Sequence, residues 1–421
     1  MSVTHEMTRQ ATVAHPEVLR TRVTGLILIA LAVLVAGIFS YGVTGDASFR
    51  LSRPNDMWAL PNLVVPAAPF NYIVSAALAF LGVRLFLRGG GKWATLFLGL
   101  GLALTVAAFL VWATAGKSFS LTGMLQATMV RAVPIALGGL AGVLCERVGV
   151  INIAIEGMLL AGAFTGALMG SIVGGIGGLV AAIAIGGLFG FILAALVVTY
   201  RMDQIIAGVV INLFVLGLTS YVSSQVFAEY RFLNNAPVFR AYNIPILGDI
   251  PVIGPMLFNQ NIFVYGAIVL VVVATYYLFY TRAGLRARSV GEYPRAADTL
   301  GINVYQTRYI NVTVAGMVAG FGGAWFTLGS VGRFDENMTG GRGFIGLAAM
   351  IFGRWHPVGA LLAALVFGFA DAMQQKLALL QTPIPSEFLA MSPYIATIIV
   401  VAGIVGRSRP PAADGQPYIK E

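Results

Sequence analysis

Only a few side chains in this sequence could do chemistry. Its three histidines and single cysteine are too scattered for the spacing of metal ligands, and one cysteine cannot form a disulfide within the chain. We therefore expect no metal site and no cofactor. Four polar residues stand out because they lie within apolar stretches: Arg131, Asn152, Glu156 and Asp371. If those stretches cross a membrane, such groups usually mark a substrate pathway or a paired structural site.

The composition indicates what surrounds these residues. Hydrophobic residues make up 58% of the chain and charged residues only 10%, whereas a soluble domain carries about 25% charged residues. So few charges exclude a soluble enzyme, and the high hydrophobicity excludes a disordered chain. Glycine is abundant but follows no triplet period, which excludes a collagen-like structure. A polytopic membrane protein remains.

Apolar runs of about 20 residues, the length of a membrane helix, predict an all-α protein with about ten transmembrane helices. The runs are 23–41, 71–87, 93–113, 121–145, 150–170, 174–199, 204–223, 261–280, 307–329 and 391–406. The first is too long for the core of a signal peptide, so we expect it to be retained. The stretch 344–375 begins with a shorter apolar piece and predicts a re-entrant or broken hairpin. Abundant glycine and alanine beyond residue 118 predict close helix packing.

The distribution of Lys and Arg predicts the orientation of these helices. Across the alternating spans, positive charge accumulates on the side that holds residues 1–22, 84–92, 282–308 and the C-terminal end. The positive-inside rule then places both termini in the cytoplasm. This orientation accounts for the basic balance of the chain, so no nucleic-acid partner is expected.

The polar residues within the spans allow two interpretations. Asn152 and Glu156 are four residues apart and would share one helix face, and Gly149 would allow the chain to break just before them. Discontinuous helices of this kind form substrate sites in transporters. Alternatively, Glu156 is a structural anchor that pairs with Arg131 or caps the end of a neighbouring helix.

Asn212, Asn311 and Trp325 are further candidates for the substrate pathway. The two asparagines could equally form hydrogen bonds between helices. Trp325 could stack on a ring of the substrate or simply pack against its neighbours. We interpret Arg131 and Asp371 as structural charges within the membrane.

The segment 281–302 combines arginines and glycines with a short helical pattern. A short helix can start from Glu292 onward: Pro294 suits its first turn, Ala296–Leu300 favour its continuation, and Gly301 is placed to end it. A short helix on the inner face could be gripped by a soluble partner. The alternative is an ordinary cytoplasmic loop whose arginines only set the orientation.

Three motifs resemble those of a known family. Glu146–Met158 (ERVGVINIAIEGM) and Gly343–Pro357 (GFIGLAAMIFGRWHP) are similar to signatures of the branched-chain amino acid/ribose-type ABC importer permeases. The similarity is best to the simple sugar/nucleoside branch. Gly284–Gly301 resembles the cytoplasmic coupling segment, or EAA loop, of ABC importer permeases.

The resemblance implies the permease subunit of a bacterial ABC importer in the inner membrane, with nucleosides or simple sugars as substrates and no hydrolytic activity of its own. No stretch matches the phosphate-binding motif G-x-x-x-x-G-K-[ST], and ATP hydrolysis would reside in a separate ATPase subunit. The other implied partners are a second related permease or a second copy of this chain, an extracytoplasmic substrate-binding protein and membrane lipid. The coupling helix would include Gly284, Gly291, Glu292, Pro294, Ala296, Ala297 and Gly301.

The resemblance also divides the chain. A permease core would occupy 116–408, preceded by an N-terminal extension with about three transmembrane helices (1–115) and followed by a cytoplasmic tail (409–421). The loop 224–260 could help to receive the binding protein or be a plain spacer. The nearest alternative function is import of branched-chain amino acids. Glu156 argues against it, because a carboxylate in the pathway would repel the carboxylate of the substrate. An ion-coupled secondary transporter is a more distant alternative.

Overall fold

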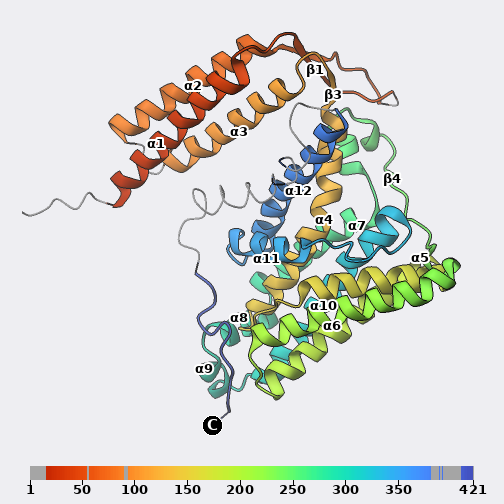
Figure 1. The fold of residues 1–421 in the computed structure, drawn as a ribbon. Helices are drawn as coiled ribbons and strands as arrows, with labels where there is room; N and C mark the ends of the chain where they lie inside the picture. The colour runs from red at the N-terminus through yellow and green to blue at the C-terminus, as the bar shows by residue number, and fades with distance from the viewer. Residues whose placement is uncertain are drawn as a thin grey trace, which may run out of the picture. The chain divides into compact units, whose positions relative to one another are not determined.

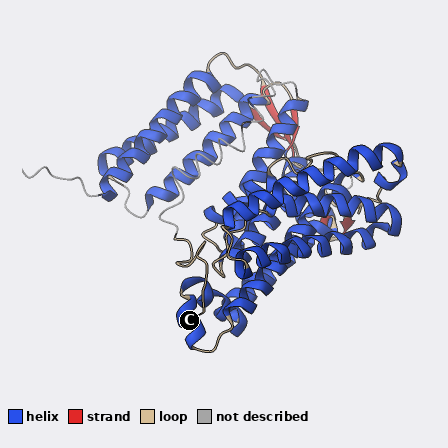
Figure 2. Cartoon of the chain, turned by 60° about the horizontal axis from the view of Figure 1, so that its bottom comes forward, coloured by secondary structure: helices blue, strands red, loops and turns tan. Residues whose placement is uncertain are grey.

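A computed structural model of the chain describes residues 16–54, 56–89, 93–380, 388, 391 and 409–420. Its regular structure is almost entirely helical (Figure 1; Figure 2), which confirms the all-α prediction. The described residues form two compact units. One takes in the described residues of 16–49 and 62–119, and the other takes in the described residues of 50–61, 120–391 and 409–420.

Three helices and a small sheet make up the first unit. They are α1 (Pro16–Leu34), continued by η1 (Val35–Ser40), β1 (Asp46–Arg50), β2 (Leu63–Pro66), α2 (Ala67–Arg88), α3 (Ala94–Ala113) and β3 (Ser118–Ser120). β1 is the central strand and pairs antiparallel with β2, with Asp46 opposite Pro66. Helices α1 and α2 approach closely at two glycines, because a Cβ on Gly25 would lie 2.7 Å from the carbonyl oxygen of Gly82.

The second unit begins with α4 (Leu121–Glu146) and contains the longest helices. Its first half continues with α5 (Ile155–Ala194), η3 (Ala195–Thr199), α6 (Gln204–Val222), η4 (Ser223–Phe227), η5 (Arg231–Asn234), β4 (Tyr242–Asn243), η6 (Leu247–Asp249), η7 (Gly254–Phe258) and β5 (Asn259–Gln260). Its second half contains α7 (Ile262–Tyr280), α8 (Arg282–Glu292), α9 (Pro294–Thr299), α10 (Val304–Phe326), η8 (Thr327–Val331), α11 (Arg342–Phe352) and α12 (Pro357–Leu379).

Helix α5 is a hairpin of two helices. Gly174 adopts φ 86° and ψ 169°, which interrupts the helical backbone. Beyond it the chain returns alongside itself, since a Cβ on Gly178 would lie 2.7 Å from both the carbonyl oxygen of Gly166 and the Cα of Gly170. The two arms correspond to the separate spans expected at 150–170 and 174–199, although the first helix begins only at Ile155.

Helices α4 and α10 form the centre of this unit and are its most buried spans. Both arms of α5 pack against α10 through small residues. A Cβ on Gly162 would lie 2.5 Å from the carbonyl oxygen of Gly320, and one on Gly186 would lie 2.3 Å from that of Gly316. Such close approach maximises dispersion contacts where lipid removes the hydrophobic drive for association. The close packing predicted from the glycine content is confirmed.

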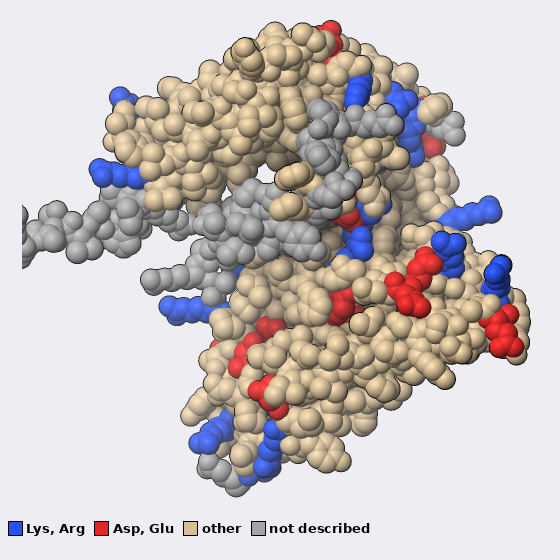
Figure 3. Space-filling view, viewed as in Figure 1, with Lys and Arg blue, Asp and Glu red and all other residues tan. Residues whose placement is uncertain are grey.

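Nine helices in the described part of the chain are long and apolar enough to cross a membrane. The expected span 391–406 lies outside the described residues. The stretch 344–375 does form a hairpin, but its second arm, α12, has 23 residues and can cross on its own, unlike the 11-residue α11. Most of the face in Figure 3 carries no charged side chain, as lipid-facing helices require.

The substitution Gly320→Val should destabilise the helix packing. A Cβ at this position would lie 2.2 Å from the carbonyl oxygen of Ala182, and overpacking of this kind costs about 1–3 kcal/mol. Gly217→Val is the matched control, because nothing lies within 4 Å of a Cβ there. Thermal unfolding in detergent should show a lower midpoint for Gly320→Val only. Equal midpoints for the two variants would contradict the close packing of α5 on α10.

Candidate functional site

One carboxylate in α12 binds guanidinium groups from two other helices. Arg131 of α4 places Nη1 3.1 Å from Oδ2 of Asp371, and Arg342 of α11 places Nη2 3.3 Å from the same oxygen. Arg131 also donates to the side chain of Gln375. The expected intramembrane charges Arg131 and Asp371 thus pair with each other, and not with Glu156. Two cations on one anion leave a net positive charge in this cluster.

A cavity of about 560 Å³ lies beside this cluster. Its size falls within the roughly 300–1,000 Å³ typical of small-molecule sites. The wall contains polar groups from the helices and two adjacent aromatic rings, contributed by Gln126, Arg131, Trp325, Phe326, Arg342 and Gln375. Of the residues predicted to line a substrate pathway, the structure brings only Trp325 into this cavity.

The cavity wall offers both ring contacts and hydrogen bonds. The rings of Trp325 and Phe326 have centroids 5.1 Å apart, and the guanidinium carbon of Arg342 lies 5.7 Å from the Phe326 ring. Nε1 of Trp325 is buried and has no hydrogen-bond partner among the described residues. Gln126 and Gln375 carry amides that can donate and accept. This set can contact a ring compound that carries hydrogen-bonding groups at its edges.

Glu156 caps the helix that carries Arg342. Its Oε1 accepts a hydrogen bond from the backbone N–H of Gly341 at 2.8 Å, and Oε2 accepts one from Gly343 at 2.6 Å. The carboxylate therefore sits at the N-terminus of α11, where backbone N–H groups and the helix dipole favour an anion. Glu156 does not line the cavity, and its geometry matches the capping alternative.

The expectation that Asn152 shares a helix face with Glu156 is wrong. Helix α5 begins at Ile155, so Asn152 lies in the preceding loop, fully buried, and its Nδ2 contacts Sγ of Cys145 at 3.4 Å. The chain break at Gly149 is confirmed, since this glycine has a φ of 76° and follows the end of α4. The spacing rule failed because it applies only within one helix.

The two other asparagines join helices. Asn212 accepts from the N–H of Gly157 at 2.7 Å and donates to the carbonyl oxygen of Ile153 at 2.8 Å. Asn311 accepts from the hydroxyl of Tyr277 at 3.0 Å and lines a separate, mostly apolar cavity of about 300 Å³. Neither residue lines the larger cavity. Whether they contact a moving substrate stays a prediction.

Sequence reasoning missed Gln126, Arg342 and Gln375 as cavity residues. The glutamines could have been found as amides in apolar helices, a pattern as visible as that of the asparagines. Arg342 gave no such signal, because it lies in a glycine-rich stretch that reads as an outer loop. Its place in the wall depends on how α11 packs.

The expected short helix is present as α9, with Pro294 at its first position and Gly301 at φ 80° beyond its end. Ala297 is buried, while Ala296 and Pro294 are partly exposed. The structure adds α8, which ends at Glu292 and was not expected as a helix.

Helix α8 packs closely against the rest of the unit at two glycines. A Cβ on Gly284 would lie 1.9 Å from the carbonyl oxygen of Tyr277 in α7, and one on Gly291 would lie 2.3 Å from that of Arg147 in the α4–α5 loop. Leu285, Tyr293 and Leu300 are exposed on the same segment. Helices α8 and α9 thus form a closely packed, partly apolar projection, which we name the coupling segment (282–300) after the role that the sequence predicts for it.

Comparison with known proteins identifies the family of this chain. The family model for the branched-chain amino acid transport system permease component matches residues 124–405. The chain belongs to this family. It is therefore a multi-pass membrane permease of an ABC transporter, with a transport role.

Three relatives align with most of the permease sequence. It is 42% identical to the guanosine ABC transporter permease protein NupQ of Bacillus subtilis (strain 168) over 308 residues, which are 70% of this chain and 96% of NupQ. It is 41% identical to the nucleoside ABC transporter permease protein NupC of Lactococcus lactis subsp. cremoris over 305 residues, 69% and 95% of the two chains. It is 32% identical to the putative glucose ABC transporter permease protein TsgC13 of Haloferax volcanii over 312 residues, 68% and 92%. No solved structure matches the permease.

Residues 409–420 of the permease, which we name the C-terminal strap, lie along the coupling segment. The N–H of Ala413 donates to the carbonyl oxygen of Gly291 at 2.9 Å, and that of Ala412 donates to Oε2 of Glu292 at 3.2 Å. Nζ of Lys420 is 3.4 Å from Oδ1 of Asp298. The strap therefore contacts both α8 and α9.

The strap also places a carboxyl group in a partly buried position. Burial raises the pKa of Asp414 to about 6, and the hydrogen bond with Glu146 and the charge of Arg308 counteract this only in part. Because the pKa in the folded state exceeds the ordinary value of 3.8, the folded strap favours the protonated form. Protonated Asp414 therefore stabilises the folded strap fully below about pH 4, and this stabilisation is lost as the pH rises through about 6.

The variant Asp414→Asn should reduce this pH dependence, because only one of the two hydrogen-bonded carboxyl groups, Asp414 and Glu146, can then still titrate. Hydrogen exchange at the amides of Ala412 and Ala413, corrected for intrinsic rates, should be faster in the wild type at about pH 7.5 than at pH 5, and this difference should be smaller in Asp414→Asn. Asp298→Asn, which removes only the ion pair with Lys420, should keep the wild-type dependence. An unchanged pH dependence in Asp414→Asn would contradict the assignment.

Proposed function

We propose that this permease imports nucleosides, driven by ATP hydrolysis on a separate ATPase subunit that docks on the coupling segment. It works beside a second permease, either a related chain or a second copy, and receives substrate from an extracytoplasmic substrate-binding protein. It lies in the plasma membrane of a bacterium with both termini in the cytoplasm. The relatives named for guanosine and nucleosides support the choice of substrate.

The observation that carries this proposal is the wall of the larger cavity. A nucleoside joins a flat base to a sugar with hydroxyl groups. Trp325 and Phe326 supply ring surfaces for the base, and base–aromatic stacking is worth about 1–3 kcal/mol. Arg131 and Arg342 offer donors to base carbonyls and sugar hydroxyls, while Asp371 compensates part of their charge.

The alternatives are less well supported. A leucine-like substrate would leave the paired rings and amides of the wall without partners. Repulsion by Glu156 no longer enters this comparison, because its carboxylate is engaged at α11. A simple sugar fits the polar groups but uses the rings less fully. An ion-coupled transporter would have no need of a projecting coupling segment.

The mechanism we propose runs through the coupling segment. Helix α8 follows α7 directly, and α9 leads within a few residues into α10. Closure of the ATPase subunits would push this segment, so that α7 and α10 move as levers. Since Trp325 and Phe326 lie at the far end of α10, such a motion would reshape the cavity and release the substrate.

The variant Trp325→Ala should lower nucleoside uptake about tenfold, because one stacking surface is lost. The measurement is uptake of radiolabelled guanosine and uridine by the complete importer in proteoliposomes, with leucine and glucose as competitors. Trp93→Ala, which alters an exposed tryptophan of the first unit, is the control and should transport normally. Inhibition by leucine but not by nucleosides would overturn the substrate assignment.

The variant Gly291→Leu should uncouple hydrolysis from transport. Its side chain would collide with the carbonyl of Arg147 and displace α8. We expect ATP hydrolysis to persist while uptake falls at least tenfold. Gly217→Leu, at an open position in α6, should retain both activities. If Gly291→Leu keeps wild-type uptake and substrate-stimulated hydrolysis, the coupling assignment is wrong.

A further inference from the structure

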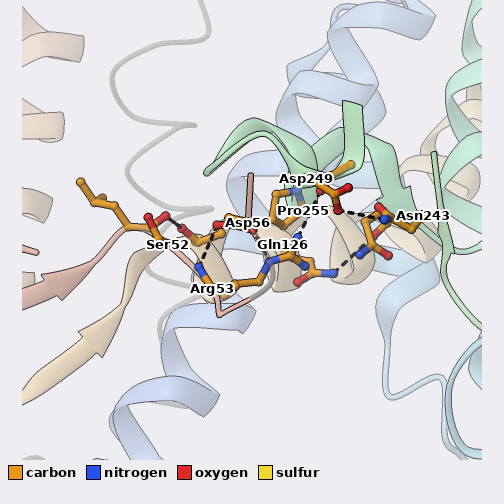
Figure 4. Close-up of polar contacts among 12 residues, drawn as sticks. Ser52, Arg53, Asp56, Gln126, Asn243, Asp249 and Pro255 are labelled. Atoms are coloured by element: carbon orange, nitrogen blue, oxygen red, sulfur yellow. Dashed lines mark hydrogen bonds and ion pairs between the residues drawn. The ribbon is translucent and has the colours of Figure 1, made fainter. Parts of the chain in front are cut away.

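The segment 50–61 connects β1 and β2 of the first unit but packs within the second. The hydroxyl of Thr122, at the start of α4, donates to the carbonyl oxygen of Leu51 at 2.6 Å. Nη2 of Arg53 donates to the carbonyl oxygen of Gly248 at 3.2 Å, and the N–H of Met57 donates to that of Asp249 at 2.8 Å. Figure 4 shows Arg53 and Asp56 beside the turn that carries Asp249.

Internal contacts hold the segment in one shape. Oδ2 of Asp56 accepts from the N–H of Arg53 at 2.7 Å, and the two side chains form an ion pair at 3.1 Å. Oγ of Ser52 accepts from the N–H of Leu60 at 2.6 Å. A loop tied in this way loses little entropy when a partner binds, which favours recognition.

The facing stretch 242–260 is also fixed. Asn243 donates to the carboxylate of Asp249 at 3.0 Å, and Gln260 donates to the carbonyl oxygen of Pro255 at 2.9 Å. Ile246 and Val252 have positive φ angles of 70° and 66°. This backbone conformation is costly for β-branched residues and often marks functional segments.

The two segments together, which we name the outer platform (50–61 and 242–260), adjoin the larger cavity. Nε2 of Gln126 donates to the carbonyl oxygen of Asn259 at 3.3 Å, and Gln126 is also part of the cavity wall. The platform rests on the N-terminal end of α4. Thr122 and Met124, close to this end of α4, are fully buried within the protein.

The platform exposes large apolar side chains. Met57 is 53% exposed and Trp58 49% on one segment, and Ile246 is 68% exposed and Ile253 52% on the other. Exposed aromatic and aliphatic groups on a rigid polar frame are typical of protein interfaces, in which tryptophan often contributes most of the affinity.

We propose that the outer platform is the docking surface for the extracytoplasmic substrate-binding protein, and that segment 50–61 of the N-terminal extension is an essential part of it. The inference rests on the proposed function and its orientation. The occupant is a substrate-delivering protein because the platform adjoins the cavity that must receive the substrate. Segment 50–61 precedes the matched residues 124–405, so it adds a contact to the shared permease core.

The test measures binding of the purified substrate-binding protein of the same importer to the complete complex in nanodiscs. Trp58→Ala should weaken this binding at least about tenfold without changing basal ATP hydrolysis. Arg53→Ala keeps the exposed side chains but frees the segment from Gly248, and should also weaken binding. Trp93→Ala, which alters an exposed tryptophan outside the platform, should bind as the wild type does.

Two results would overturn the proposal. The first is wild-type affinity in both Trp58→Ala and Arg53→Ala. Nucleoside uptake is measured in the same preparations. Normal uptake together with unchanged affinity would contradict the docking assignment and leave the proposed function intact. The second is quenching of a bimane label at Met57→Cys by brominated phosphatidylcholine without protection by the binding protein, which would show that the surface contacts lipid.

Discussion

The pairing of Asp371 with two arginines is the interaction on which the candidate site depends. An unpaired guanidinium within the membrane is costly, which favours the pairing of both arginines with this carboxylate. Here one carboxylate in α12 fixes Arg131 of α4 and Arg342 of α11 at the edge of the cavity. The same contacts that satisfy the charges therefore join three helices and shape the wall.

Other polar groups in the unit likewise bind partners on neighbouring elements. Glu156 satisfies the first N–H groups of α11 and so orients Arg342, and Asn212 satisfies backbone groups around the start of α5. Each carries out a structural task that also positions the cavity. The glycine contacts between α5 and α10 complete this arrangement, because they bring the backbones close enough for side chains from both sides to meet.

The end of the unit that carries the coupling segment and the end that carries the outer platform are built in similar ways. At one end the C-terminal strap is tied to the coupling segment through backbone hydrogen bonds. At the other, segment 50–61 is tied to the stretch 242–260. Both ends thus present rigid surfaces assembled from segments far apart in the sequence. Rigid ends allow a force or a bound partner at either surface to act on the helices between them.

Local chemistry and composition were enough to predict the membrane class, nearly all the spans and the short helix α9, with Pro294 in its first turn and Gly301 just beyond its end. These features are readable from the sequence because solvation and backbone preference act residue by residue. The polar partners were not readable in this way. Asn152 lies in a loop, Glu156 caps α11, and Asp371 binds two arginines.

Helix packing selects these partners, and it brings together residues that no local pattern connects. Glu156 and Gly341 are 185 residues apart in the chain, and Arg131 and Asp371 are 240 residues apart. A buried charge requires some partner, so the sequence could predict that Arg131 and Asp371 would be paired groups. Which atoms meet, and that a cavity opens beside them, depends on the tertiary arrangement of α4, α11 and α12.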